Sequence, residues 1–104
     1  MTETAKVHYA LKMMPPRPTF AQDMTDGERA VMQKHVIYWK ELMAGGKVVL
    51  YGPVSDPRGT YGFGVVEVAD EAEVRALTAN DPAAEINQYE FYPMRAMIRK
   101  SAGG

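Results

Sequence analysis

The chain has 104 residues and a formal net charge of −1, from 12 basic and 13 acidic side chains. This balance argues against a nucleic-acid-binding surface, which needs a clear basic excess. Cysteine is absent, which excludes disulfides, a thiolate nucleophile and cysteine-ligated metals. No apolar run approaches the roughly 20 residues that span a bilayer, and the N-terminus lacks the layout of a signal peptide. We therefore expect one soluble, cytoplasmic domain (1–104, core about 5–99) that binds neither nucleic acid nor membrane.

The first part of the chain predicts a strand followed by a loop. Residues 6–14 alternate in a way that is typical of a strand. Three prolines within the next four positions exclude both a helix and a central strand there. Loops this long in a small domain are often functional, so we expect residues 15–23 to flank the mouth of a pocket.

A long amphipathic helix is predicted next. Thr25 and Glu28 have the spacing of a capping box, which marks the start of a helix. The Gly45-Gly46 pair marks its end, because glycine takes a left-handed turn without a Cβ clash. Between them, apolar side chains recur at the helical period and predict a broad stripe that packs on a sheet. The stripe consists of Val31, Met32, His35, Val36, Tyr38, Trp39, Leu42 and Met43. Trp39 in particular should be buried.

Two further strands are predicted after this helix. Residues 48–51 form a short run of β-branched and aromatic side chains that predicts a buried strand, and Gly52-Pro53 should stop it. Residues 61–68 are the expected partner strand. Gly62 and Gly64 within it indicate a bulge or a close approach by a ligand or another backbone.

The last third of the chain predicts a short helix and a final strand. Asp70 has the position of an N-cap. Asp81-Pro82 should end this helix, because the residue before proline avoids helical angles. Residues 88–99 alternate throughout, and Pro93 among them indicates an edge position or a bulge.

The order of these elements, βαββαβ, predicts an α+β ferredoxin-like subunit with both helices on one face of a four-stranded antiparallel sheet. The predicted strands are apolar on both faces, with sets such as Val7/Tyr9/Leu11 and Tyr61/Phe63/Val65. Two helices can cover one face only, and an uncovered apolar face of this size is unusual. We therefore expect a second copy of the chain to cover the other face and form a homodimer.

Several segments, taken in order, resemble the YciI-like (YCII-related) family of small α+β proteins. They are KHVIYWKEL with its helical His35, GGKVVLYGP, Gly59, Gly62, Gly64, Asp70, Asp81-Pro82 and Tyr89. The resemblance covers about residues 30–97, most of the chain. It implies a single YCII-related domain whose sheet pairs with that of a second subunit in a dimeric α/β barrel. It also implies an active site built on His35 and Asp81.

The chemistry of His35 and Asp81 suits an acid–base pair. Imidazole takes up or releases a proton near neutral pH, and a carboxylate partner fixes its tautomer and stabilises the imidazolium. Such a pair needs no metal or cofactor, and we expect neither. The function expected is lyase, isomerase or dehalogenase-type chemistry on a small organic acid.

Structural explanations for the same residues stay open at this stage. His35 can be an ordinary core histidine, and Asp81 a helix-stop aspartate beside proline. His8 should make a cross-strand or surface contact. The alternative function is a non-catalytic small-ligand-binding or interaction module. Catalysis requires His35 within hydrogen-bond reach of Asp81 and open to a pocket, whereas a packed, dry His35 favours the alternative.

Overall fold

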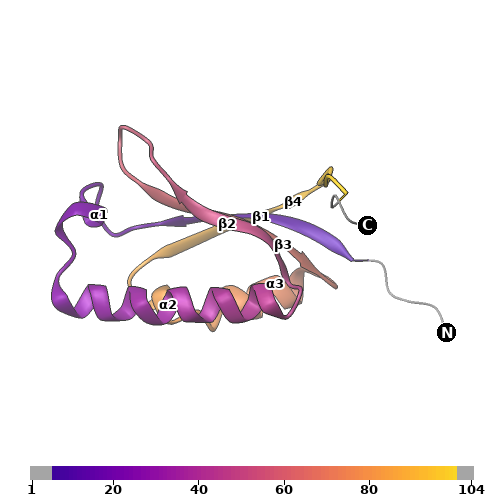
Figure 1. Ribbon diagram of the computed structural model, residues 1–104, viewed down its shortest axis with the longest axis horizontal. Helices are drawn as coiled ribbons and strands as arrows, with labels where there is room; N and C mark the ends of the chain where they lie inside the picture. The colour runs from indigo at the N-terminus through magenta and orange to yellow at the C-terminus, as the bar shows by residue number, and fades with distance from the viewer. Residues whose placement is uncertain (1–5, 101–104) are drawn as a thin grey trace.

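The computed structural model describes residues 6–100, which form a four-stranded antiparallel sheet with both long helices on one face (Figure 1). The strands are β1 (Val7–Met14), β2 (Val48–Val54), β3 (Tyr61–Val68) and β4 (Gln88–Met94), in the spatial order β2-β3-β1-β4. The helices are α1 (Phe20–Asp23), α2 (Asp26–Ala44), α3 (Glu71–Ala79) and the 3₁₀ turn η1 (Pro82–Glu85). This mixed α and β arrangement agrees with the ferredoxin-like prediction.

The predicted helix caps are confirmed. Thr25 Oγ1 accepts the Glu28 N–H at 3.1 Å, and the Glu28 carboxylate accepts the Thr25 N–H at 2.9 Å. At the far end of α2, Gly46 has a φ of +81°, the left-handed conformation that glycine adopts readily. Asp70 caps α3 by accepting the Glu73 N–H at 2.9 Å. The caps at the two ends of α2 fix where this helix begins and ends, and therefore where His35 lies along it.

The hydrophobic core lies between the sheet and the two long helices. Trp39, Val74 and Leu77 come from the helices and pack onto residues that alternate along the strands. The strand residues of this core are Tyr9, Leu11, Val48, Val66 and Val68. Trp39 is only 3% exposed, as predicted, and its ring lies 5.5 Å from that of Tyr51 between centroids.

Three predicted boundaries are wrong. β2 runs through Gly52-Pro53 to Val54, because β2 is an edge strand where proline's missing N–H costs no ladder bond. β4 ends at Met94 rather than residue 99, because Met94 already pairs with His8 next to the start of β1. Residues 15–23 were expected to be a loop throughout, but the last four of them form the short helix α1. The proposed edge position of Pro93 is correct, since β4 is the other edge strand.

The apolar stripe on α2 is narrower in the structure than in the sequence. Val36 and Met43 are 43% and 40% exposed, so these two members of the predicted stripe do not belong to the core. Trp39 is the buried residue of the helix. The helix therefore contacts the sheet along a narrow line and leaves space beside it.

The pairing register corrects the predicted faces of the sheet. Tyr9 and Leu11 belong to the core beneath the helices, so they cannot contribute to an interface on the opposite side. That opposite side, the outer face, carries a row that crosses all four strands through paired residues. The row consists of Leu50, Val65, Ala10 and Tyr92. Phe63 is on this face as well, because it pairs with Lys12, which alternates with the buried residues of β1.

Gly64 shows why β3 needs glycine. A Cβ at this position would lie 3.3 Å from the Trp39 ring, from the Leu50 carbonyl oxygen and from the Tyr51 Cβ. These neighbours are a rigid indole and backbone, which cannot move aside cheaply. The expected close approach of another backbone is present at the Leu50 carbonyl, and the side chain of Trp39, which the sequence did not indicate here, lies equally close.

Substitution of this glycine should destabilise the fold. We expect Gly64→Ala to lower the free energy of unfolding by roughly 1–3 kcal/mol through overpacking against Trp39. Gly52→Ala is the matched control, because a Cβ at Gly52 meets nothing within 4 Å. Urea unfolding of both variants measures the difference. Equal stability of the two variants would contradict the close contact at Gly64.

Candidate functional site

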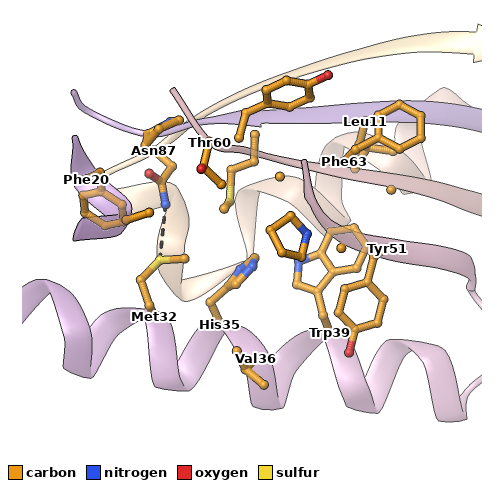
Figure 2. A pocket seen from close by; sticks show the side chains of 18 of the residues that line it. Leu11, Phe20, Met32, His35, Val36, Trp39, Tyr51, Thr60, Phe63 and Asn87 are labelled. Carbon is orange, nitrogen blue, oxygen red and sulfur yellow. Dashed lines mark hydrogen bonds between the residues drawn. The ribbon is translucent and has the colours of Figure 1, made fainter. Parts of the chain in front are cut away.

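A cavity of about 300 Å³ lies between α2, the α1 turn and the floor made by β2 and β3 (Figure 2). Most of its walls are apolar side chains, among them Leu11, Met13, Phe20, Met32, Val36 and Trp39. The few polar side chains in the wall are His35, Thr60, Asn87 and tyrosines. This size falls at the lower end of the range for small-molecule sites.

The segment between β1 and α2 closes one end of the cavity. Its lining residues are Pro15, Phe20, Ala21 and Met24. The Arg17 guanidinium holds the segment by donating to both Glu28 oxygens at 2.8 and 2.9 Å and to Asp23 Oδ1 at 2.8 Å. On the other side Gly59, with a φ of +146°, packs against Pro18, where a Cβ would come within 3.1 Å of the Pro18 Cα. The expectation that this loop flanks the pocket is confirmed.

His35 projects from the middle of α2 toward the cavity (Figure 2). Its side chain is 14% exposed, and its Nδ1 lies 2.8 Å from Asp81 Oδ2. A carboxylate oxygen can only accept, so Nδ1 carries the proton and donates it to Asp81. In the neutral imidazole Nε2 then holds a lone pair on the ring edge that lines the cavity. The predicted contact between His35 and Asp81 is therefore present, and the partly exposed His35 lines the cavity.

Asp81 is placed by a local rule of helix capping. It is the N-cap of η1, and its Oδ1 accepts the Ala83 N–H at 2.8 Å. Pro82 takes the first position of this turn, where its missing N–H costs nothing. Asp81 therefore has both contacts that the sequence suggested, since one oxygen caps the turn and the other accepts from His35.

The second oxygen of Asp81 collects three donors. His35 Nδ1 and Trp39 Nε1 lie 2.8 and 2.9 Å from Oδ2, and the Tyr89 hydroxyl donates to the same oxygen. The carboxylate itself has no exposed surface. Burial alone would raise the pKa of Asp81, but these hydrogen bonds and that of Ala83 outweigh it and lower the pKa below its usual value. Asp81 is therefore a buried anion stabilised by four donors.

The same contacts act on the tyrosines nearby. Burial, followed by the hydrogen bond to Asp81, raises the pKa of Tyr89. Burial and the charge of Asp81 also raise the pKa of Tyr38, whose hydroxyl donates to the Leu77 carbonyl at 2.7 Å. Both hydroxyls therefore stay protonated near neutral pH and act as donors.

Sequence reasoning missed three residues of the site. Trp39 was predicted as core, and its Nε1 donor role depends on Asp81 being beside it. Tyr89 was noted only as the opening of the last strand. Asn87 gave no signal, since a lone asparagine in a short connection is ordinary turn material. One signal was available in the sequence. His35 and Trp39 are about one helical turn apart, so their side chains lie on the same face of the helix and can contact the same residue.

The remaining histidine is outside the site. His8 Nε2 lies 3.2 Å from Glu67 Oε2 across β1 and β3, which confirms the predicted cross-strand role. Over residues 6–100, no three His, Cys, Asp or Glu side chains gather as metal ligands do. No helix in the described part of the chain is long and apolar enough to cross a membrane.

Comparison with known proteins places the chain beside small α+β proteins. The profile of the YCII-related domain matches residues 10–98. The uncharacterised protein TM1266 from Thermotoga maritima shares the fold with a TM-score of 0.55 and 13% identity, over 86% of this chain and 99% of that one. NE2512 from Nitrosomonas europaea, of unknown function, has a TM-score of 0.50 and 12% identity, over 96% and 100% of the two chains.

A third similar structure has a named activity. It is 5-chloro-2-hydroxyhydroquinone dehydrochlorinase (TftG) from Burkholderia phenoliruptrix AC1100, in complex with 2,5-dihydroxybenzoquinone. Its TM-score is 0.54 at 22% identity, over 79% of this chain and 90% of that one. No curated protein matches the chain significantly. At these identities the similar structures show a shared fold.

The Asp81 carboxylate should contribute to stability in a pH-dependent way. Both oxygens of Asp81 accept hydrogen bonds. In Asp81→Asn an NH₂ group replaces one of them, so in either orientation of the amide a donor faces another donor. We expect the free energy of unfolding to fall by roughly 1–3 kcal/mol at pH 7. The pKa of Asp81 is lower in the folded protein than in the unfolded chain, so its carboxylate stabilises the fold above the unfolded pKa. The difference from the unmodified protein should therefore shrink as pH falls below about 4 and Asp81 becomes protonated in the folded state.

Chemical denaturation between pH 2 and pH 7 measures this difference. Asp26→Asn, at an exposed position of α2, is the control and should stay within about 0.5 kcal/mol at every pH. Equal free energies of unfolding for Asp81→Asn and the unmodified protein at pH 7 would contradict a charged, hydrogen-bonded Asp81.

Proposed function

Because the chain belongs to the YCII-related family, we propose that it is a small enzyme in which His35 and Asp81 act as an acid–base pair on a small organic acid. One observation carries this proposal. Nδ1 of His35 is held by Asp81 at 2.8 Å, while the same ring lines a cavity large enough for a small molecule. A base fixed on one side and open on the other is the arrangement that general acid–base catalysis needs.

The proposed reaction begins with proton removal. The neutral His35 takes a proton on Nε2 from a weakly acidic position of the bound molecule, and Asp81 stabilises the imidazolium that forms. The proton then returns to another atom in an isomerase, or the electron pair expels a leaving group in a lyase or dehalogenase. A positioned base of this kind contributes typically about 10²–10⁴-fold to a rate. The apolar walls strengthen each polar contact by excluding water.

The similarity to TftG agrees with this class of chemistry. The name dehydrochlorinase describes the loss of hydrogen and chlorine from a substrate, which requires a base. At 22% identity the likeness concerns the fold, so the proposal depends on the geometry of His35 rather than on that name. The reaction and the substrate of this chain are therefore inferred from its own residues.

Solvent proton exchange tests the proposal without a known substrate. We expect the protein, mixed in D₂O with small unsaturated and ring-derived organic acids, to introduce deuterium at an acidic C–H position of at least one of them. Proton NMR reads the loss of signal. His35→Gln removes the base and should abolish this exchange, and Asp81→Asn should slow it by a large factor through loss of orientation.

His8→Gln is the matched control, because His8 is bound to Glu67 on the outer face and should leave exchange unchanged. Exchange that survives His35→Gln would assign the activity elsewhere. If no compound exchanges although some bind in the cavity, the chain is a non-catalytic ligand-binding module, which is the alternative function.

We also propose that two copies pair through the outer face in a dimeric α/β barrel. Leu50 and Tyr92 of its apolar row are exposed in the single chain, and covering them removes apolar surface from water. Lys12 and Glu90 are paired neighbours beside this row, so the same face also offers opposite charges to a second copy. A stable interface of this kind buries more than about 1,000 Å² in total.

Light scattering at micromolar concentration should give twice the chain mass of 11.6 kDa. Leu50→Glu places a charge within the apolar row and should yield a folded monomer. Ile37→Glu, on the exposed side of α2, should leave the dimer intact. A monomeric unmodified protein, or equal effects of the two variants, would rule out the outer face as the interface.

A further inference from the structure

The cavity contains no fixed charge in its wall. Among the described residues that line it, none is Lys, Arg, Asp or Glu. The Asp81 carboxylate, which accepts from His35, is a full negative charge beside this wall. A ligand carboxylate would be desolvated here without a fixed cation, close to a second negative charge, and this arrangement is costly. The wall therefore favours an uncharged molecule.

Asn87 brings an unsatisfied polar group to this wall. It is 5% exposed, and its Nδ2 lies 3.6 Å from the Met32 sulfur, which is a weak acceptor (Figure 2). Because a thioether can accept but not donate, the nitrogen faces Met32 and the oxygen faces away from it. Within residues 6–100, the Asn87 Oδ1 atom is buried without any hydrogen-bond partner. Buried acceptors of this kind are rare and cost free energy until a donor meets them.

The backbone holds Asn87 in place independently of its side chain. Its N–H donates to the Ala83 carbonyl at 2.9 Å, at the end of the turn that Asp81 caps. Met32, whose sulfur accepts from the Asn87 side chain, lies nearly one helical turn before His35 on α2. The unsatisfied carboxamide and the histidine are therefore two polar groups in the wall of one apolar cavity.

Resting on the proposed function of His35, we propose that the cavity binds an uncharged ring that carries a hydroxyl group, and that this hydroxyl donates to the Asn87 carboxamide. The reacting position of the ring then faces Nε2 of His35. The organic acid of the proposed function is, on this basis, a phenol- or enol-type molecule rather than a carboxylate. Asn87 is the residue that selects it, because a ring without the hydroxyl leaves the carboxamide oxygen unsatisfied.

Access to the oxygen requires a small movement. Oδ1 is shielded from water, so the carboxamide must turn about its last torsion to present it to a ligand. That torsion is broad for asparagine, and the contact given up is the 3.6 Å approach to a sulfur. A hydroxyl in the cavity gives the oxygen the hydrogen bond that it lacks.

Three ligands of equal ring size test the proposal. 2-Naphthol offers a hydroxyl donor, 2-methoxynaphthalene offers only an acceptor, and 2-naphthoate carries a negative charge at pH 7. We expect 2-naphthol to bind about tenfold more tightly than either of the others, which corresponds to one satisfied hydrogen bond. In ¹⁵N-labelled protein the side-chain amide signals of Asn87 should shift further with 2-naphthol, which adds a hydrogen bond to the ring-current shift, than with 2-methoxynaphthalene.

Asn87→Leu removes the carboxamide with little change in volume. The affinity for 2-naphthol should then fall about tenfold, to that of 2-methoxynaphthalene, whose own affinity should not change. Asn80→Leu, at an exposed position after α3, is the matched control and should bind all three ligands like the unmodified protein. If Asn87→Leu does not fold, the NMR shifts and the ligand comparison in the unmodified protein still decide.

Two results would overturn the inference. One is tightest binding of 2-naphthoate, and the other is 2-naphthol binding that Asn87→Leu does not weaken while the Asn87 amide signals shift no further than with 2-methoxynaphthalene. Both readouts are independent of turnover. If deuterium exchange fails but naphthol binding depends on Asn87, only the enzyme proposal is overturned. If exchange occurs but 2-naphthoate binds most tightly, only the proposal of an uncharged hydroxylated ring is overturned.

Discussion

The structure depends on one buried anion. Asp81 is held by donors from three different elements: His35 and Trp39 on α2, the N–H of Ala83 in η1, and Tyr89 on β4. A buried carboxylate without such donors would cost several kcal/mol, so the three elements are joined at the point where the charge needs them. Residues 46 positions apart in the chain thereby become neighbours.

The same contacts that stabilise Asp81 also prepare His35. Each donor on Oδ2 keeps the carboxylate ionised, and an ionised carboxylate is what fixes the proton of His35 on Nδ1. Stability and orientation are therefore not separate properties of this site. Trp39, whose indole N–H donates to Asp81, acts on His35 through the oxygen that both residues share.

The empty space beside His35 follows from small residues in the sheet. Gly62 and Gly64 line the cavity from β3, where larger side chains would meet Met13 and Trp39. The indole occupies the volume above Gly64, and the cavity extends along the narrow contact of α2 with the sheet toward Phe20. A chain that buries a modest core thus still has room for a ligand.

Much of this could be predicted where the signal is local. Caps such as Thr25 with Glu28 depend on a few neighbouring residues, and they appear in the structure as predicted. The end of β4 depends on where β1 begins, which alternation in one strand does not reveal. Alternation also places the side chains of Tyr9 and Ala10 on opposite faces of β1, but it does not tell which face lies under the helices.

Within the site, the difference between prediction and structure has the same cause. His35 and Asp81 could be paired through the family resemblance, whereas Asn87 could not be found. Its importance comes from an unsatisfied oxygen, and whether an oxygen is satisfied depends on every group that the fold brings near it.

The position of Trp39 has a practical consequence. It is the chain's one tryptophan, its indole N–H is bound to Asp81, and its ring lies 6.2 Å from that of His35 between centroids. Indole emission responds to a neighbouring imidazolium and to the polarity around the ring. The tryptophan emission of the protein therefore comes from the centre of the site, so that protonation or occupancy at this site can be followed optically, without label, dye or substrate.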